Sequence, residues 1–189
     1  TSREQLAKKV SEKTGRDEKE LEDASVYFHP LYLKKKEFFC REGSMSRQIA
    51  FVKQGILRSY FTIGEKENTS FFQLPGTIVV ALRSFVMKKE SQENIQALTD
   101  AELISISRED LYALYTGNWK WQQVGRVLIE SYYIFQEKRM LMQQNLSAQE
   151  RYLDFSASHP EVLQSVPLQY VASYLGVSPE TLSRIRATL

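Results

Sequence analysis

Six short runs of aromatic and β-branched residues dominate the stretch from residue 36 to residue 107, and they constrain the fold more than any other feature. The runs read EFFCR, QIAFVKQ, ILRSYFTI, TSFFQL, NIQAL and ELISIS. Glycines separate them at intervals of 9 to 12 residues, at Gly43, Gly55, Gly64 and Gly76. Many short strands at regular spacing are typical of an antiparallel sandwich, jelly roll or barrel. Eight of the ten phenylalanines lie between residues 28 and 85, so this region holds the main core.

The segment that precedes the strands has a helical pattern. Residues 1–34 are rich in charge, and their apolar side chains recur at loose helical spacing, at Leu6, Val10, Leu21 and Val26. This spacing predicts two short helices with a break near Thr14 and Gly15. Asp17 is the expected N-cap of the second helix.

A long helix is predicted after the strands, over residues 119–145. SRED at 107–110 has the Ser-x-x-acid form of a helix start. The long helix follows it, and within that helix the apolar residues fall mostly three or four apart. A helix of this length spans roughly 40 Å at 1.5 Å per residue. It either crosses a large core or pairs with its twin in a dimer, and beside a small β-domain we favour the dimer. The expected dimer interface consists of Val124, Leu128, Tyr132, Phe135 and Met142.

The residues from 147 onward predict a smaller, all-helical domain. SAQE at 147–150 is a capping box that begins one helix. Residues 168–175 present one apolar face, and Gly176 then stands where a left-handed residue ends a helix. Ser178 is the expected cap of a further helix, with Pro179 in its first position. Two helices around a turn that contains glycine are the pattern of a helix-turn-helix.

The final helix of this pair has an inward and an outward face. Leu182 and Ile185 are expected to point inward, which leaves Glu180, Ser183 and Arg184 outside. In a DNA reader this part of the helix enters the major groove, where Arg bonds guanine and Glu accepts from cytosine. The alternative is a helix surface that is simply exposed to solvent. Residues 147–189 carry three basic and four acidic side chains, so the electrostatic attraction of this segment for DNA is weak.

Composition excludes several other classes of protein. Cys40 is the one cysteine and there are two histidines, so an internal disulfide is excluded and a zinc site or iron–sulfur cluster is not expected. No run approaches the roughly 20 apolar residues that cross a bilayer, and the charged N-terminal region is no signal peptide. No nucleophile set, phosphate-binding glycine loop or metal-spaced histidine pair is present. We expect a cytoplasmic protein that is not an enzyme, holds no metal or cofactor and does not bind membranes.

The order of parts resembles the Crp/Fnr transcription regulators, the catabolite-activator family, over about residues 30 to 189. LGVSPETLSRIR is the most specific piece, because Glu180, Thr181, Ser183 and Arg184 look like the recognition-helix signature of the Fnr branch. The resemblance implies that Glu180, Ser183 and Arg184 contact bases, with Thr181 and Arg186 as backbone contacts. It also implies a winged-helix type of domain, although the wing is apparently absent from the chain, and RNA polymerase as a partner.

The chain departs from this family at the cyclic-nucleotide cassette. Val80 and Ala81 stand where the family has a Gly-Glu pair, and Ser91 or Gln92 stands where it has the phosphate-binding Arg. Loss of the partner of a buried phosphate charge is severe, so we predict no tight binding of cyclic AMP. An effector, if one exists, is a different small molecule. The candidate pocket consists of Val80, Ala81, Leu82, Arg83, Ser91 and Gln92.

The sequence as a whole predicts an α+β chain with an N-terminal antiparallel β-roll, a jelly roll like that of cyclic-nucleotide-binding domains. Residues 1–118 form this sensor-like domain with its N-terminal helices, 119–146 the dimerisation helix, and 147–189 the helix-turn-helix domain. The leading hypothesis is a homodimeric regulator that reads a pseudo-palindromic DNA site through residues 179–189. The alternative is a small-molecule-binding or protein-interaction module that has lost DNA binding.

Overall fold

The computed structural model describes residue 11 and residues 23–189. The predicted break near Thr14 and the cap at Asp17 lie outside the described residues. Within the segment predicted as helical, a short 3-10 helix, η1, spans Asp23–Tyr27, and His29–Leu33 is strand β1. The helical prediction is therefore wrong for His29–Leu33, because these residues pair with strand β8 along their whole length.

In the described part of the chain, eight strands form two four-stranded sheets, and every pairing among them is antiparallel. The orders are β1-β8-β3-β6 and β2-β7-β4-β5. This arrangement confirms the predicted jelly roll. The strands are β1 His29–Leu33, β2 Phe38–Cys40, β3 Gln48–Gln54, β4 Leu57–Ile63, β5 Lys66–Gln73, β6 Ile78–Val79, β7 Asn94–Ala97 and β8 Ala101–Ser107.

The core of the roll lies between the two sheets and comes from the inward residues of each strand. Apolar side chains from both sheets are fully buried there. Burial of each valine, leucine or isoleucine side chain stabilises the fold by about 1.5–3 kcal/mol. Gly55 makes the turn between β3 and β4 at φ 94°, and a Cβ there would lie 2.5 Å from the Asp100 carbonyl oxygen. The fully buried apolar residues of this core are Val52, Leu57, Val79, Ile95, Ala97 and Leu103.

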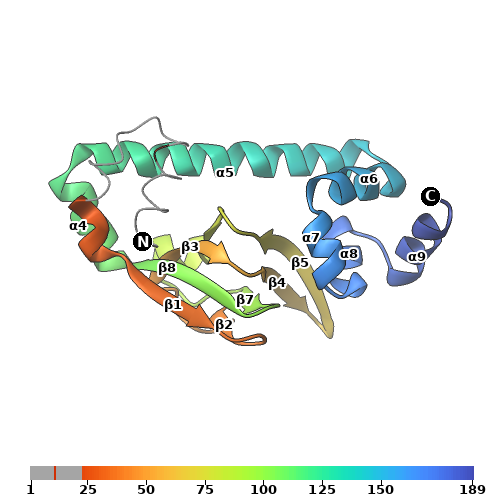
Figure 1. The fold of residues 1–189 in the computed structure, drawn as a ribbon, viewed down its shortest axis with the longest axis horizontal. Helices are drawn as coiled ribbons and strands as arrows, with labels where there is room; N and C mark the ends of the chain where they lie inside the picture. Colours follow the sequence, from red (N-terminus) through yellow and green to blue (C-terminus); the bar gives the residue numbers. More distant parts are fainter. Residues whose placement is uncertain (1–10, 12–22) are drawn as a thin grey trace.

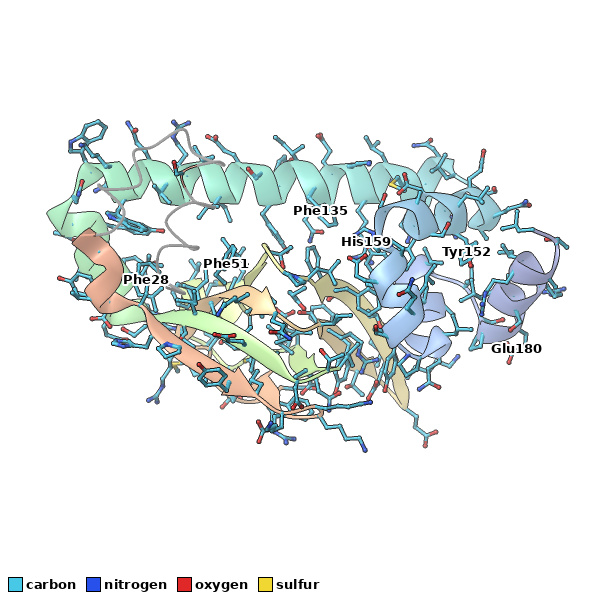
Figure 2. The ribbon with its side chains drawn as sticks, viewed as in Figure 1. Phe28, Phe51, Phe135, Tyr152, His159 and Glu180 are labelled. Atoms are coloured by element: carbon cyan, nitrogen blue, oxygen red, sulfur yellow. The ribbon has the colours of Figure 1, made fainter. Side chains whose placement is uncertain are left out.

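One helix lies within the roll, and two further helices connect the roll to the C-terminal part of the described chain. They are α3 Leu82–Met87, between the strands β6 and β7, then α4 Arg108–Gly117 and α5 Trp119–Asn145. The start of α5 packs on the roll, where the Trp121 ring lies 5.7 Å from that of Phe28 (Figure 2). The rest of α5 runs along the length of the molecule (Figure 1). Within the described chain, no helix combines the length and the apolar character that a membrane span requires.

The remaining helices form a small domain beneath the far end of α5 (Figure 1). They are α6 Ala148–Ser158, α7 Pro160–Ser165, α8 Leu168–Leu175 and α9 Pro179–Ala187. The capping box predicted at Ser147 and Glu150 is confirmed. One apolar cluster joins this domain to the roll, so the two parts share a core. Its buried members are Ile56, Phe72, Leu74 and Leu98 of the roll and Phe155, Val162, Val166, Val171, Ala172, Leu175 and Leu182 of the helices.

Candidate nucleic-acid interface and effector region

The turn between α8 and α9 has the geometry that its residues predict. Gly176 adopts φ 71°, and the backbone N–H of Val177 donates to the Ala172 carbonyl oxygen at 3.0 Å. Ser178 then caps α9, because its hydroxyl oxygen accepts from the Thr181 N–H at 3.2 Å. Pro179 occupies the first helical position, where no backbone N–H is needed. This helix-turn-helix fixes which face of α9 points outward.

The predicted DNA-reading residues lie on the exposed side of α9. Leu182 is 1% exposed on the opposite side, within the core shared with the roll. The Arg184 guanidinium donates to the Thr181 hydroxyl at 3.3 Å, so these two side chains meet one turn apart. Figure 2 places Glu180 at the end of the molecule away from the roll. Thr181 is half-buried, and the exposed members of the set are Glu180, Ser183, Arg184 and Arg186.

The charges of this face are set by local contacts. A hydrogen bond from Ser178 holds the pKa of the Glu180 carboxyl below its ordinary value, and the Arg184 charge acts in the same direction. Glu180 is therefore an acceptor at neutral pH, while Arg184 is a donor. An acceptor and a donor four residues apart on one helix face can distinguish base pairs in the major groove.

Side chains of α5 and α6 hold the helix-turn-helix in place. The Tyr174 carbonyl oxygen accepts from Arg139 at 3.4 Å and from Gln143 at 3.3 Å. The Arg139 guanidinium also lies 4.1 Å from the centre of the Tyr174 ring. Arg151 donates to the Leu175 carbonyl oxygen at 3.1 Å. The last turn of α8 is thus bound to the long helix immediately before the turn that leads to α9.

The structure corrects the predicted dimer interface on α5. Val124 is 2% exposed and Leu128 packs against the same core cluster, so both face the roll of their own chain. Phe135 also turns toward the roll, 5.0 Å from the ring of Phe71 (Figure 2), and Tyr132 lies 6.4 Å from that ring. α5 is apolar on two faces, and Val124 and Leu128 lie on the face that the roll of their own chain covers. Met142 is half-buried.

The opposite face of α5 carries large apolar side chains that the described chain leaves exposed. Tyr133 is 68% exposed and Ile134 is 63% exposed. Runs of exposed apolar residues on one helix face mark an interaction surface. We name this set the outer face of α5, and it consists of Ile129, Tyr133, Ile134, Met140 and Leu141.

The residues predicted for the effector pocket come from the two ends of the segment that contains α3. Arg83 of α3 hydrogen-bonds the side-chain oxygen of Gln92, which brings the two predicted stretches together. Ser91 is buried, and its hydroxyl donates to the Glu93 carbonyl oxygen at 2.8 Å. Ala81 belongs to the core of the roll, and Val80 packs against the cluster beneath α5. Arg83 is the one cation of the predicted set, and an amide already engages it.

Sequence reasoning missed two residues of this region, Phe71 and Glu93. Phe71 of β5 packs its ring against α5, as described above. Burial raises the pKa of the Glu93 carboxyl to about 7. Burial also raises the pKa of Tyr132 on α5, and the Glu93 charge adds to that rise. No local pattern marks either residue, because each acquires its surroundings from a helix far along the chain.

We expect Glu93→Gln to make the protein more stable at high pH. The folded state holds a proton on Glu93 up to about pH 7, whereas the ordinary pKa is 4.5, so the free energy of unfolding falls as pH rises through this window. The variant should match the wild type near pH 4.5 and exceed it by about 1–3 kcal/mol at pH 8. Urea unfolding between pH 4.5 and pH 8 measures the difference. Parallel pH profiles for the variant and the wild type would contradict it, and the exposed Glu90→Gln is the control.

Comparison with known proteins shows which folds this chain is similar to. A sequence model of the cyclic nucleotide-binding domain matches residues 30–118. No curated protein sequence matches the chain. Among solved structures, FixK2 from Bradyrhizobium japonicum superposes with a TM-score of 0.74 at 18% identity, over 86% of this chain and 84% of that one.

Two further structures agree with this result. The Thermus thermophilus catabolite activator protein gives a TM-score of 0.60 at 21% identity, covering 96% of this chain and 86% of that one. A transcriptional regulator of the Crp/Fnr family from Eubacterium rectale gives 0.71 at 16% identity, covering 90% and 82%. Residues 30–118 are thus similar to cyclic nucleotide-binding domains, and the chain has the fold of these solved structures. The resemblance expected from the sequence is confirmed at the level of the fold.

Proposed function

We propose that this chain is a homodimeric transcription regulator that reads a pseudo-palindromic site in double-stranded DNA through α9. The observation that carries the proposal is the outward set on α9. A capped helix with Leu182 buried behind it presents Glu180, Ser183 and Arg184 on its far side, at the end of the molecule. These three residues are assigned to base contacts, and Thr181 and Arg186 to the DNA backbone.

The dimer is proposed to form through the outer face of α5. Two copies that pair along this face would bury large apolar side chains around a two-fold axis. A two-fold dimer of this kind presents two copies of α9, and half-sites one helical turn apart, roughly 34 Å, then follow. The exposed apolar residues support this face over the one predicted from the sequence.

The effector is proposed to be a small molecule other than cyclic AMP, or to be absent. No carboxylate replaces the family's glutamate at Val80 and Ala81, and Arg83 is already bonded to Gln92. RNA polymerase as a partner is carried over from the family resemblance, and a cytoplasmic location from the composition of the chain. The shared fold also favours a regulator over an enzyme.

The slightly negative net charge of residues 147–189 favours one alternative, a small-molecule-binding or protein-interaction module that no longer binds DNA. Residues 147–189 carry three basic and four acidic side chains. Nonspecific affinity for DNA comes largely from such charge, so a reader of this composition depends on base contacts.

Selection of bound duplexes from random DNA tests the proposal. The full chain is used at a fixed salt concentration of about 0.1 M, where electrostatic attraction is strongly screened, first alone and then with a small-molecule extract of cells. An enriched palindrome in either condition is the expected result. If no sequence is enriched with or without the extract, DNA reading is wrong and the interaction module is favoured.

A further inference from the structure

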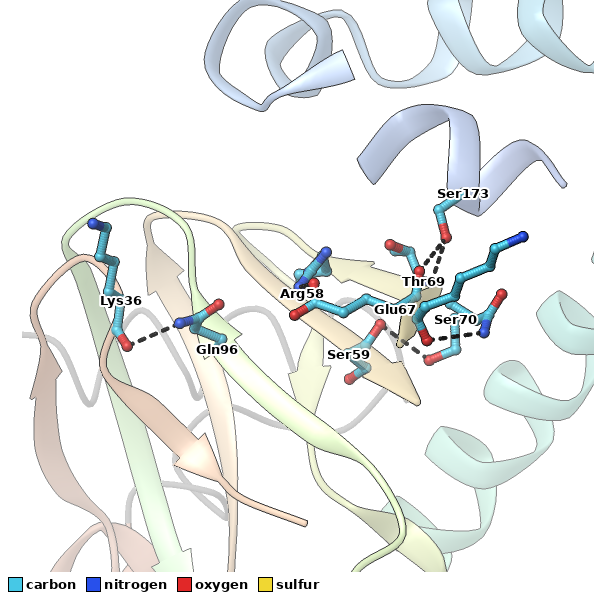
Figure 3. Close-up of polar contacts among 10 residues, drawn as sticks. Lys36, Arg58, Ser59, Glu67, Thr69, Ser70, Gln96 and Ser173 are labelled. Carbon is cyan, nitrogen blue, oxygen red and sulfur yellow. Dashed lines mark hydrogen bonds and ion pairs between the residues drawn. The ribbon is translucent and has the colours of Figure 1, made fainter. Parts of the chain in front are cut away.

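Strand β5 is one of the two edge strands of the second sheet. It pairs with β4 on one side, and within the described strands nothing pairs with its other side. An edge strand presents a row of unpaired N–H and C=O groups, which proteins cover with a helix or loop. Helix α8, the first helix of the helix-turn-helix, lies against this edge (Figures 1 and 3). The DNA-reading part of the chain therefore completes the sheet of the sensor-like part.

One hydroxyl group makes the polar part of this contact. The Thr69 backbone N–H of β5 donates to the Ser173 hydroxyl oxygen at 2.8 Å. The same hydroxyl donates to the Glu67 carbonyl oxygen at 3.0 Å (Figure 3). The Ser173 hydroxyl thus hydrogen-bonds one backbone N–H and one backbone carbonyl group of the edge strand β5, as a neighbouring strand would. Its helix neighbours Val171 and Ala172 point into the core instead.

Aromatic rings make the apolar part of the contact. The Phe72 ring of β5 lies 5.3 Å from that of Tyr174 and 6.1 Å from that of Phe155. Tyr174 is also the residue whose carbonyl oxygen α5 holds through Arg139 and Gln143. Residues 173 and 174 therefore connect the roll and the long helix to the turn at Gly176, two residues further on.

A fully buried charge weakens this contact. The Arg58 guanidinium of β4 lies 4.0 Å from the centre of the Tyr60 ring and 3.6 Å from that of Tyr170 on α8. Its Nη2 pairs with the Glu67 carboxylate, but its Nε and Nη1 meet no hydrogen-bond partner among the described residues. Buried donors without partners are costly, and they regain water when the two parts separate. The burial of Arg58 thus opposes the docking that Ser173 and Phe72 favour.

We infer that the contact between α8 and β5 is a latch, in which Ser173 positions α9 relative to the roll and the buried Arg58 keeps the contact separable. The inference rests on the proposed function only for the statement that α9 reads DNA. Strand β5 also carries Phe71, which packs against α5. A displacement of β5 would therefore move α9 through the contacts of Ser173 and Tyr174. The latch therefore links strand β5 of the roll to the reading helix.

The first experiment measures where α9 lies relative to the roll. Spin labels at Lys89→Cys and Thr188→Cys in a Cys40→Ala background report the distance within one chain, with labelled chains diluted into unlabelled full-length protein. Ser173→Ala should broaden the distance distribution, and Ser173→Thr, which retains the hydroxyl, should restore the narrow one. Ser156→Ala removes a hydroxyl bonded only to the Leu153 carbonyl oxygen of its own helix and is the control. A distribution in Ser173→Ala that matches this control would overturn the latch.

The second experiment tests the opposing part of Arg58. Replacement of a buried ion pair by apolar side chains is often neutral or stabilising, whereas loss of one partner is destabilising when the other stays buried. Arg58→Met leaves Glu67, whose side chain is 42% exposed, so the remaining carboxylate keeps its water. In Arg58→Met, the Thr69 amide should therefore exchange with solvent roughly tenfold more slowly than in the wild type, if docking gains about 1.4 kcal/mol. Unchanged or faster exchange would show that Arg58 does not oppose docking. Neither experiment uses DNA. Both results can therefore be interpreted even if the duplex selection shows that the proposed function is wrong.

Discussion

Arg184→Ala should abolish sequence-specific DNA binding while the fold persists. Arg184 is exposed on α9, four residues after Glu180, and its one side-chain contact is the Thr181 hydroxyl. A bidentate Arg–guanine contact contributes about 1–3 kcal/mol of discrimination. A two-fold dimer uses it twice, so affinity for the selected palindrome should fall roughly 100-fold or more. Titration of a labelled duplex at fixed salt measures the loss.

Two comparisons separate base reading from general charge. Arg186→Ala, assigned to the DNA backbone, should lower affinity for all sequences alike and reduce the salt dependence. Arg41→Ala removes an exposed arginine that follows β2 and lies 3.8 Å from the centre of the Phe38 ring, and it should leave affinity unchanged. If Arg184→Ala weakens selected and random duplexes equally, its assignment to base contact is wrong.

Tyr133→Glu should dissociate the dimer. Tyr133 is 68% exposed in the single chain and lies at the centre of the outer face of α5. Pairing of two outer faces would bury the new carboxylate of each copy in apolar surroundings and bring the two near one axis. A cost of at least about 2 kcal/mol per copy raises the dissociation constant roughly 1000-fold. Sedimentation equilibrium over a range of protein concentrations measures it.

The chain offers a matched control for this substitution. Tyr32 of β1 is 67% exposed, so Tyr32→Glu places the same charge on an equally open tyrosine away from α5. It should leave the oligomeric state unchanged. If Tyr133→Glu forms dimers with the same dependence on protein concentration as the wild type, the outer face is not the interface. Loss of the dimer in both variants would show that the effect of the added charge is not specific to the outer face.

The two predictions are linked through the geometry of the reading helix. Each copy of α9 is fixed to α5 through Tyr174, so the spacing of two reading helices depends on how two α5 helices pair. A monomer contacts a single half-site and keeps only one of the two base contacts. Tyr133→Glu is therefore expected to lower affinity for the palindrome even though Tyr133 lies far along the chain from α9.

Local patterns of the sequence were sufficient for much of the fold. The strands of the roll, the cap at Ser178 and the turn at Gly176 follow from side-chain alternation and from the conformations that single residues allow. Leu182 and Arg184 were assigned to opposite faces of α9 by the helical period alone. Strand β1 at His29–Leu33 was missed, because its strand character comes from pairing with β8 and not from its own residues.

The sequence by itself therefore determined the elements, the helix-turn-helix and the outward residues of α9, since each depends on neighbours within a few positions. Only the tertiary structure decided which face of α5 meets the roll, why Glu93 keeps its proton to about pH 7, and how α8 docks on β5. These properties depend on contacts between distant residues, such as Thr69 and Ser173, which are 104 positions apart. A pattern with a period of two or 3.6 residues carries no information about such a pair.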